Sequence, residues 1–384
     1  MPKIFLITST DLKIESIGSF YLAELISLSK KNKFYICSLS HFLLPLNYFN
    51  HFVFLNKVLS VLTKSCFFQN LRITLFKYFF LYLYTFFLGC KIRKYSTDCI
   101  WLTASSPELI LIGERLSQQG FDMRLTIWDP PEYILSSNKL NSYIYSSLMF
   151  SFINLLKKSK SVSVVSDSML TKYSNFNKYI YVVRYGVKNL FYNNINSSKS
   201  IRIIFAGSLY SKNEWNALIH ALDAMRWKLG DLKILLFFAG NFPMFGAIKS
   251  DKVIYLGRLT HKETILQLKK MQIAYLPYWF SKNHRETATM SFPGKLSTYL
   301  ECGLVVFNHS PKYTEISKMI SKFPFGVSCN SCSIKVIRKC LLEAKNLLIK
   351  KERVALNIKQ AVTSELSSKI QLYRFNMFIS KNIL

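Results

Sequence analysis

The feature that most constrains the fold of this chain is an alternation of strand and helix patterns that runs through it twice. In the first half, the apolar run KIFLIT (3–8) precedes a helical pattern over 17–31 and a strand-like run at 34–39. Further strand-like runs follow at 99–105, 123–128, 161–166 and 179–187, with a helical pattern over 108–119. Strands that alternate with helices are typical of parallel sheets. We therefore expect an α/β fold that begins with a doubly wound domain.

The alternation starts again after NNINSSKS (193–200), whose Asn and Ser residues predict a linker. Strand-like runs at 201–208, 233–240, 253–257, 273–278 and 304–308 alternate with helical patterns over 216–225 and 262–271. A basic helix over about 333–362 is expected to close the structure. We predict two Rossmann-like domains that face each other across a ligand-binding cleft. Their bounds are 1–190, on the acceptor side, and 191–365, on the nucleotide-sugar side, with a tail or helix over 366–384.

The charge of the chain indicates an anionic partner. There are 51 Lys and Arg against 21 Asp and Glu, a net charge of +30. Phosphate-bearing small molecules, an anionic membrane and nucleic acid all have the complementary charge. Coding bias towards Lys, Asn, Ile, Phe and Tyr is an alternative explanation for part of this composition, although it does not explain the shortage of Glu.

The start of the chain and its cysteines bear on location. MPKIFLITST contains no apolar segment of the kind that export signals carry, so we expect no export by a standard signal. The eight cysteines include one close pair, Cys329 and Cys332, with neither a second such pair nor a nearby His to complete a zinc site. We expect reduced thiols and a cytoplasmic protein.

Two turns are candidates for binding phosphate. In SFPGKLSTYLECGLVVFNH (291–309), Pro293, Gly294 and Lys295 open a helix that Gly303 ends. A helix start offers free N–H groups and partial positive charge, so a lysine there suits a diphosphate. In IIFAGSLYSKN (203–213), Gly207 follows a strand and Lys212 precedes a helix. The alternative for each is an ordinary connection of an α/β sheet that binds nothing.

At these residues the sequence resembles the retaining "group 1" family of GT-B nucleotide-sugar glycosyltransferases. The family pattern G-x-L-Y-x-x-[KR]-N is matched by GSLYSKN (207–213), and P-x-K-L-x-E-Y-L-x-x-G-x-P-V by PGKLSTYLECGLVV (293–306). VVRYGVKNLF (182–191) resembles the interdomain motif, and WDPPEY (128–133) an Asp-containing loop. IGSFYLAEL (17–25) resembles the glycine loop and first helix that face the donor.

The resemblance implies transfer of a glycosyl group from a nucleoside diphosphate sugar to an acceptor hydroxyl, with retention at the anomeric carbon. The catalytic candidates are Asp129 and Glu301. The resemblance implies these donor-binding residues: Gly18, Gly207, Ser208, Lys212, Asn213, Pro293, Gly294, Lys295, Leu296 and Thr298. Asp129 orients the acceptor or sugar in this interpretation; the alternative is a turn residue before Pro-Pro. No catalytic base is identified.

Several residues depart from the family pattern. The Glu that usually holds the donor ribose is Thr298, and Glu301, one turn later, either replaces it or is a solvated helix residue. The Arg that often follows the phosphate-loop glycine is Ser208. The more amino-terminal Glu of the family has no aligned counterpart, although Glu286 is nearby in an expected loop. These departures keep open a GT-B scaffold that has lost catalysis.

The sequence also bears on whether the reaction needs a metal ion or a cofactor. The sequence contains no D-x-D triplet, the usual carboxylate pair for a divalent ion on a diphosphate. We expect a metal-independent reaction without a cofactor, in which lysines and helix starts stabilise the departing diphosphate. His220 is expected to be structural, while His284, before the second turn, is a candidate to reach the cleft.

The acceptor side contains a long stretch without acidic residues. Between Glu24 and Asp98 there are ten Lys or Arg and no Asp or Glu. The uncharged run from Tyr78 to Cys90 is too short to span a bilayer comfortably and ends in a basic cluster. It predicts a helix in the cytoplasmic leaflet, on the inner face of the membrane, and a lipid-linked acceptor in bacterial surface polysaccharide or lipopolysaccharide assembly. The alternative is a buried core helix. Nucleic acid is not an expected partner, because no motif for it occurs.

Overall fold

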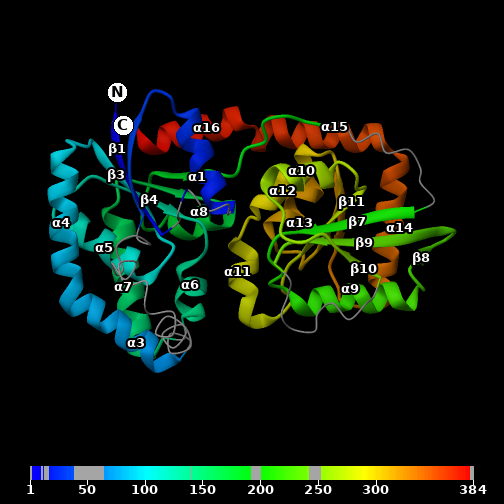
Figure 1. Ribbon diagram of the computed structural model, residues 1–384, viewed down its shortest axis with the longest axis horizontal. Helices are drawn as coiled ribbons and strands as arrows, with labels where there is room; N and C mark the ends of the chain where they lie inside the picture. The colour runs from blue at the N-terminus through cyan, green and yellow to red at the C-terminus, as the bar shows by residue number, and fades with distance from the viewer. Residues whose placement is uncertain are drawn as a thin grey trace, which may run out of the picture. The chain divides into compact units, whose positions relative to one another are not determined.

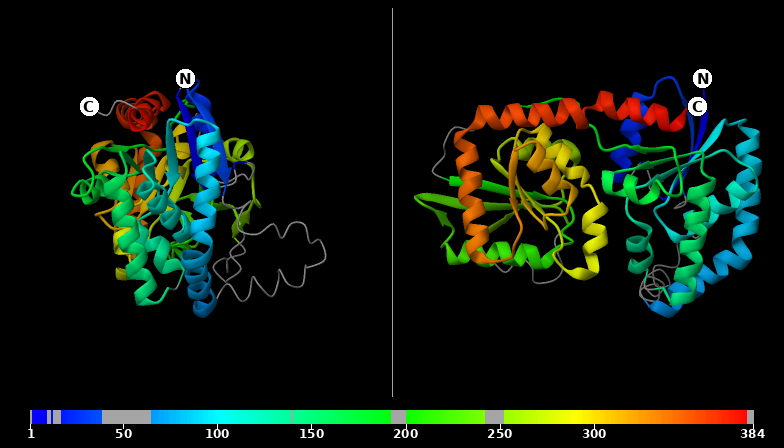
Figure 2. Two further views of the ribbon diagram at one scale, coloured as in Figure 1. Left: turned by 90° about the vertical axis from the view of Figure 1, so that its left-hand side faces the viewer. Right: turned by 180° about the vertical axis from the view of Figure 1, so that it is seen from behind.

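The computed structural model describes residues 2–9, 12, 17–38, 65–138, 140–191, 200–241 and 252–380. The predicted linker at 193–200 lies outside the described residues except for Ser200. Two compact units make up the chain (Figures 1 and 2). Unit 1 is Met1–Val183 with Leu372–Leu384, and unit 2 is Arg184–Gln371.

Unit 1 is built on a parallel sheet with the strand order β2-β1-β3-β4-β5-β6. Its strands are β1 (Lys3–Thr8), β2 (Lys33–Ser38), β3 (Cys99–Thr103), β4 (Met123–Ile127), β5 (Ser161–Val164) and β6 (Ile180–Val182). Its helices are α1 (Ile17–Leu28), α3 (Cys66–Leu75), the π-helical η3 (Phe76–Phe80), α4 (Leu81–Lys94), α5 (Pro107–Gln118), α6 (Pro131–Ser137), α7 (Ser142–Lys158), α8 (Asp167–Tyr173) and α16 (Ser368–Ile379). The strand order changes direction between β1 and β3.

The central strands of unit 1 are apolar along their whole length because helices cover both faces of the sheet. Every residue of β3, β4 and β5 is buried. The carboxyl-terminal helix α16 contributes to this core, since the ring of Phe375 lies 4.8 Å from that of Trp101. The Ser161 hydroxyl also donates to the Phe378 carbonyl. From Leu372 onward, α16 therefore completes the fold of unit 1.

Unit 2 has a sheet in the order β10-β9-β7-β11-β12-β13, with a short antiparallel β8 at β9. The strands are β7 (Ser200–Ala206), β8 (Lys228–Leu229), β9 (Leu232–Ala239), β10 (Val253–Tyr255), β11 (Ile273–Pro277), β12 (Val305–His309) and β13 (Gly326–Cys329). The helices are α9 (Lys212–Ala224), α10 (His261–Leu268), the 3-10 turn η4 (Lys282–His284), α11 (Arg285–Met290), α12 (Gly294–Glu301), α13 (Glu315–Lys322), α14 (Ile334–Ile349), α15 (Lys351–Ala361) and the π-helical η5 (Val362–Leu366).

The order of the parallel strands of unit 2, read in chain order, is 3-2-1-4-5-6, that of the doubly wound nucleotide-binding fold. Its direction changes between β7 and β11, and ligands of such sheets bind at the carboxyl ends of strands at this point. The expected doubly wound α/β architecture is therefore confirmed in both units. In detail, the predicted helix over 333–362 is two helices that meet at Lys350. Glu286, which we expected in a loop, is the second residue of the short helix α11.

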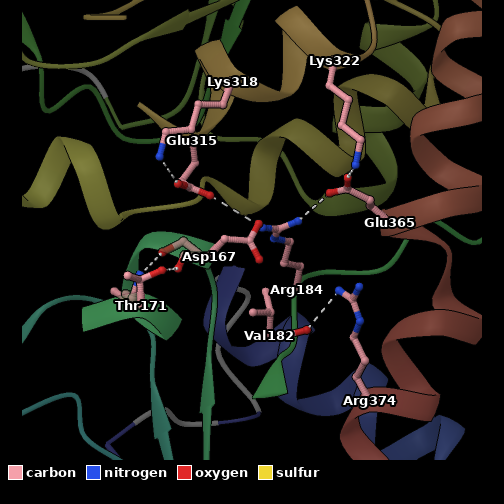
Figure 3. Close-up of polar contacts among 11 residues, drawn as sticks. Asp167, Thr171, Val182, Arg184, Glu315, Lys318, Lys322, Glu365 and Arg374 are labelled. Carbon is pink, nitrogen blue, oxygen red and sulfur yellow. Dashed lines mark hydrogen bonds and ion pairs between the residues drawn. The ribbon is translucent and has the colours of Figure 1, made fainter. Parts of the chain in front are cut away.

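A buried charge network holds the first residues of unit 2 to its carboxyl-terminal part (Figure 3). Nη1 of Arg184 lies 3.0 Å from Oε2 of Glu365, and Nη2 lies 3.8 Å from Oε2 of Glu315. The backbone N–H of Arg184 donates to Oε1 of Gln371 over 2.7 Å. The strand that we predicted over 179–187 ends at Val182. Two residues later, the backbone N–H of Arg184 bonds to the Gln371 side chain and not to a neighbouring strand.

Candidate functional site

The turn after β7 is the first part of the candidate site in unit 2. Gly207 has a φ of +113°, which favours glycine, and its N–H donates to the Ala239 carbonyl at the end of the neighbouring strand β9. Gly240 follows with a φ of +152°. A side chain at Gly240 would collide with the carbonyl oxygen of Gly207. The two glycines thus allow two strand ends to approach each other at the point where the sheet changes direction.

Lys295, the second residue of α12, lies beside this turn. Its side chain is 8% exposed, and its Nζ has no hydrogen-bond partner among the described residues. Nζ lies 4.3 Å from the ring centroid of Phe205 and 5.2 Å from that of Tyr210. A Cβ built on Gly207 would lie 3.4 Å from it. Lys295 therefore presents a buried amine to the backbone of the Gly207 turn.

Burial lowers the pKa of Lys295 to about 7. A buried ammonium without an anion is unfavourable, because it loses hydration and gains no opposite charge. The two aromatic rings compensate for part of this loss. An anion that reaches the Gly207 turn would restore the ordinary, charged state of the lysine.

Two helix starts belong to this site: Lys295 lies in the first turn of α12, and α9 begins two residues after Tyr210, whose ring lies beside the amine. α12 begins at Gly294 after Pro293, and α9 begins at Lys212 after Ser211; in the described part of the chain, neither start has a side-chain cap. The hydroxyl of Ser211 is buried and also has no hydrogen-bond partner there. Uncapped helix starts offer N–H groups and partial positive charge to an anion. The site therefore combines a close backbone turn, an amine and two helix starts.

The other residues proposed from the sequence are spread more widely. Ser208, Lys212 and Asn213 are exposed, whereas Leu296 is buried. Thr298 is half-buried, one helical turn after Lys295. Glu301 ends α12, six residues or about 9 Å along the axis from Lys295. Gly18, in α1, and Asp129, after β4, belong to unit 1.

A buried hydrogen-bond network fixes the start of α9. The Glu214 carboxylate accepts the Phe280 N–H at 2.8 Å, and the Tyr275 hydroxyl donates to the Glu214 carbonyl over 3.0 Å. That hydroxyl also lies 2.9 Å from Nδ1 of His309, whose Nε2 lies 3.0 Å from the Ser331 carbonyl. Burial lowers the pKa of His309 to about 4, so its imidazole is neutral at physiological pH. The network joins α9 to the ends of β11 and β12.

Aromatic side chains form the wall next to Lys295. The ring of Tyr210 lies 4.7 Å from that of Trp279, whose Nε1 donates to the Tyr210 carbonyl over 3.2 Å. The ring of His284 also stacks on Trp279, with 4.7 Å between the ring centroids, and its Nδ1 lies 2.8 Å from the Ser281 hydroxyl. His284 is thus part of an aromatic stack, and His220 is exposed on α9.

Unit 1 has a recess of about 470 Å³ at its own change of strand direction. The hydroxyls of Ser9, after β1, and Ser105, after β3, lie 2.7 Å apart across this point. Asp129 lies at the exposed rim, and the surrounding atoms raise its carboxyl pKa by desolvation. Nη2 of Arg72, on α3, lies 2.9 Å from Oε1 of Glu108 and lines the same recess. A polar ligand would meet hydroxyl, carboxylate and guanidinium groups here.

Sequence reasoning missed several of these residues. Gly240 has a signal, since Phe-Ala-Gly recurs at 205–207 and 238–240, each time at the end of an apolar strand. Glu214, Tyr275 and His309 have none, because their contacts join residues from 22 to 66 positions apart. Arg72 lies in the basic stretch between Glu24 and Asp98, which we interpreted as a membrane-binding segment.

Comparisons with known proteins address the fold. No family model and no curated protein matches the sequence. Among solved structures, sucrose-phosphate synthase from Thermosynechococcus elongatus is 11% identical, with a TM-score of 0.67 and 98% of each chain covered. An α,α-trehalose-phosphate synthase (UDP-forming) from Burkholderia xenovorans, in complex with glucose-6-phosphate, is 8% identical, with a TM-score of 0.60 and 98% and 99% covered.

A glycosyltransferase from Rickettsia africae is 13% identical, with a TM-score of 0.58 and 99% of each chain covered. Each alignment extends over both units of this chain. Because the sequence identities are only 8–13%, these similarities show the fold and nothing finer. The chain therefore has the GT-B fold, the pair of doubly wound domains on which these glycosyltransferases are built.

Proposed function

We propose that the protein is a retaining, metal-independent glycosyltransferase of the hexosyltransferase type. It moves a sugar from a nucleoside diphosphate sugar to a lipid-linked saccharide acceptor, in bacterial surface polysaccharide or lipopolysaccharide biosynthesis. The observation that carries the proposal is the buried amine of Lys295, which lies next to the Gly207 turn without an anionic partner in the described residues. A diphosphate is the anion that such a turn suits.

In this proposal the donor diphosphate lies on the Gly207 turn and the start of α12. Lys295 gives it a positive charge, and the N–H groups of Gly294 and the following residues give it hydrogen bonds. Lys212, at the start of α9, adds a second cation at the rim. As the bond to the sugar breaks, these groups stabilise the negative charge that develops on the leaving diphosphate. The UDP-forming neighbour supports this choice of leaving group.

The other donor contacts follow from position. Ser208 follows Gly207, Asn213 is the second residue of α9, Leu296 is buried in α12, and Thr298 and Glu301 lie farther along α12. We assign the ribose to Thr298, with Glu301 as the alternative. Gly18 completes the donor side from unit 1 in this proposal.

We place the acceptor in the recess of unit 1, where Asp129 orients the accepting hydroxyl. The raised pKa of Asp129 suits a carboxylate that accepts a hydrogen bond or proton from a hydroxyl. The solved neighbours are named for sugar phosphates, so a sugar acceptor is supported at the coarser level. The lipid anchor and a location on the inner face of the cytoplasmic membrane rest on the basic, aromatic stretch from 65 to 95.

Calorimetry with UDP, GDP, ADP and CDP tests the donor site. We expect one nucleotide to bind, with at least tenfold weaker binding by Lys295→Ala and a smaller loss for Lys212→Ala. Lys262→Ala, on an exposed position of α10, is the matched control and should bind as the wild type does. Failure of all four nucleotides to bind, or equal binding by Lys295→Ala, would contradict the donor assignment.

The second candidate function is a scaffold that binds a nucleotide sugar without transferring it. Thr298 and Ser208, which replace a Glu and an Arg of the family pattern, favour it. The two functions differ in turnover: an enzyme releases nucleoside diphosphate from its donor, whereas a scaffold binds the donor and leaves it intact. A nucleic-acid-binding protein would instead prefer polynucleotides, with a steep dependence on salt.

A further inference from the structure

One long helix of unit 1 has an apolar surface that the fold leaves uncovered. α3, η3 and α4 form a continuous helix over Cys66–Lys94, which by length and composition alone is capable of crossing a membrane. Figures 1 and 2 show it along the side of unit 1, next to α5 and α7. A third of its most apolar part is buried within the fold.

The buried stripe of this helix attaches it to unit 1. The buried residues are Ile73, Phe76, Leu81, Thr85, Leu88, Gly89 and Ile92. Lys77 donates to the Ser147 hydroxyl of α7 over 2.6 Å, and Arg72 pairs with Glu108 of α5 at 2.9 Å. A helix that crossed a bilayer would lose these contacts. The packing therefore favours a helix that stays on unit 1.

The π turn explains why so many aromatic residues face outward. Residues 76 and 81 are both buried, five positions apart, where an α-helix would repeat after three or four. The extra residue of η3 keeps the buried stripe in phase on both sides of the turn. It leaves the three consecutive side chains of Tyr78, Phe79 and Phe80 between 56% and 70% exposed.

The exposed face runs along most of the helix, from Phe67 to Phe87. Its apolar members are Phe67, Phe68, Leu71, Leu75, Tyr78, Phe79, Phe80, Tyr82, Leu83, Phe86 and Phe87. Scattered exposed apolar residues are normal, whereas a contiguous face marks an interaction site. We call these eleven residues the aromatic face.

Charge identifies the partner of the aromatic face. Lys91, Arg93 and Lys94 lie in the last turn of α4, and the sequence has no Asp or Glu between Glu24 and Asp98. Aromatic side chains with lysines and arginines at one end match the boundary between acyl chains and anionic headgroups. A protein partner with an acidic, apolar groove would match the charge as well, and is an outcome of the test below.

We propose that the aromatic face docks on an anionic lipid bilayer, with the helix in the plane of the membrane surface. α3 connects the aromatic face to the recess of unit 1, because Leu71 and Leu75 belong to the face while Arg72 lines the recess. Docking would therefore bring one wall of the recess to the headgroups. This places the polar head of an amphiphilic acceptor within reach of the recess, a step that rests on the proposed function.

Vesicle flotation tests the docking. The full chain is mixed with vesicles of phosphatidylcholine alone, or of phosphatidylcholine with about 30% phosphatidylglycerol, which gives the surface a negative potential. We expect binding to the anionic vesicles that weakens with salt. Phe79→Ser with Phe86→Ser should weaken it at least tenfold, and Arg93→Gln with Lys94→Gln should weaken it on anionic vesicles only.

The matched control is Ile349→Ser with Leu356→Ser, which removes two exposed apolar side chains of unit 2. It should bind vesicles as the wild type does. All of the substituted residues are exposed, so melting curves should agree with that of the wild type and confirm that each variant folds.

Three results would overturn the proposal. The first is no binding of the wild type to either kind of vesicle, and the second is equal vesicle binding by the Phe79 and Phe86 double variant. The third is that this double variant differs from the wild type only in self-association, measured by sedimentation. Nucleotide binding is measured separately on the same variants. Vesicle binding without nucleotide binding would contradict the donor assignment and leave the docking surface standing. Nucleotide binding without vesicle binding would contradict the docking and the proposed membrane location, and leave the donor assignment standing.

Discussion

At the scale of single residues, Lys295 is held in a state that opposes folding. Its pKa is about 7 in the folded protein against an ordinary value of 10.5. The unfolded chain therefore binds the proton of this lysine more tightly than the folded protein does. The contribution of Lys295 to the free energy of unfolding is lowest below pH 7 and recovers as the pH rises towards 10.5. At pH 7 the difference amounts to about 4 kcal/mol.

We predict that Lys295→Met stabilises the ligand-free protein at pH 7 by about 2 kcal/mol, because the loss of the contacts with Phe205 and Tyr210 offsets part of the gain. Urea denaturation measures this. Lys262→Met, at an exposed position, should leave the stability within about 0.5 kcal/mol of the wild type. A destabilised Lys295→Met would mean that the lysine serves the fold and not a ligand.

His309 gives a prediction of the same pH direction, in a lower pH range. Burial lowers its pKa from 6.5 to about 4, so the unfolded chain takes up the proton first and stability falls as the pH falls from 6.5 towards 4. We expect the wild type to lose about 2 kcal/mol more than His309→Gln between pH 7 and pH 5. His220→Gln, on the exposed face of α9, should follow the wild type. Parallel curves for wild type and His309→Gln would refute a buried, neutral imidazole.

At the scale of elements, the candidate donor site depends on the close approach of the ends of β7 and β9. A side chain at Gly240 would collide with the Gly207 carbonyl, at a φ of +152° that L-residues rarely adopt. We predict that Gly240→Ala destabilises the protein by about 2 kcal/mol or more and weakens nucleotide binding at least tenfold. Thermal unfolding and calorimetry measure the two effects.

The control for Gly240 is Gly257→Ala. Gly257 also has a positive φ, of +77°, but open space surrounds its Cβ position. Its substitution should lower stability by about 1 kcal/mol and leave nucleotide binding unchanged. Equal effects of the two variants on binding would show that the Gly207 turn does not form the site.

The sequence was most informative where the structure depends on neighbouring residues. Apolar runs such as CIWLT and MRLTI predict strands because a parallel sheet is buried on both faces. The turn at Gly207 and the helix start at Gly294 are local too, and both are in the structure. The burial of Lys295 against Phe205 was not predictable from the sequence. Lys295 is on α12, whereas the ring belongs to β7, 90 residues earlier in the chain.

The long helix shows the opposite case. The uncharged run from Tyr78 to Cys90 predicts a helix but not which of its residues face outward. The outward face depends on the π turn at Phe76–Phe80, whose extra residue keeps the buried stripe on one side of the helix. Neither alternative, a buried core helix or a surface helix, was complete: one stripe is buried and the other is exposed.

At the scale of the whole molecule, two sheets with a change of strand direction each give one candidate site. Unit 2 offers an amine, glycine turns and helix starts, whereas unit 1 offers hydroxyls, a carboxylate and a guanidinium. The first set suits a diphosphate and the second a polar acceptor, which is the division of labour that a glycosyl transfer requires. The +30 charge of the chain agrees with a diphosphate donor and an anionic surface.

The central claim is that a donor diphosphate binds at Lys295, and the uptake of protons on binding tests it most directly. Calorimetry of the nucleotide that binds, at pH 8 in two buffers of different ionisation enthalpy, gives the number of protons. A lysine with a pKa of about 7 is mostly neutral at pH 8 and becomes charged beside a diphosphate, so we predict an uptake of about 0.9 proton. Lys295→Met should remove the uptake together with most of the affinity. Tight binding with no proton uptake, or with the same uptake in Lys295→Met, would contradict the account.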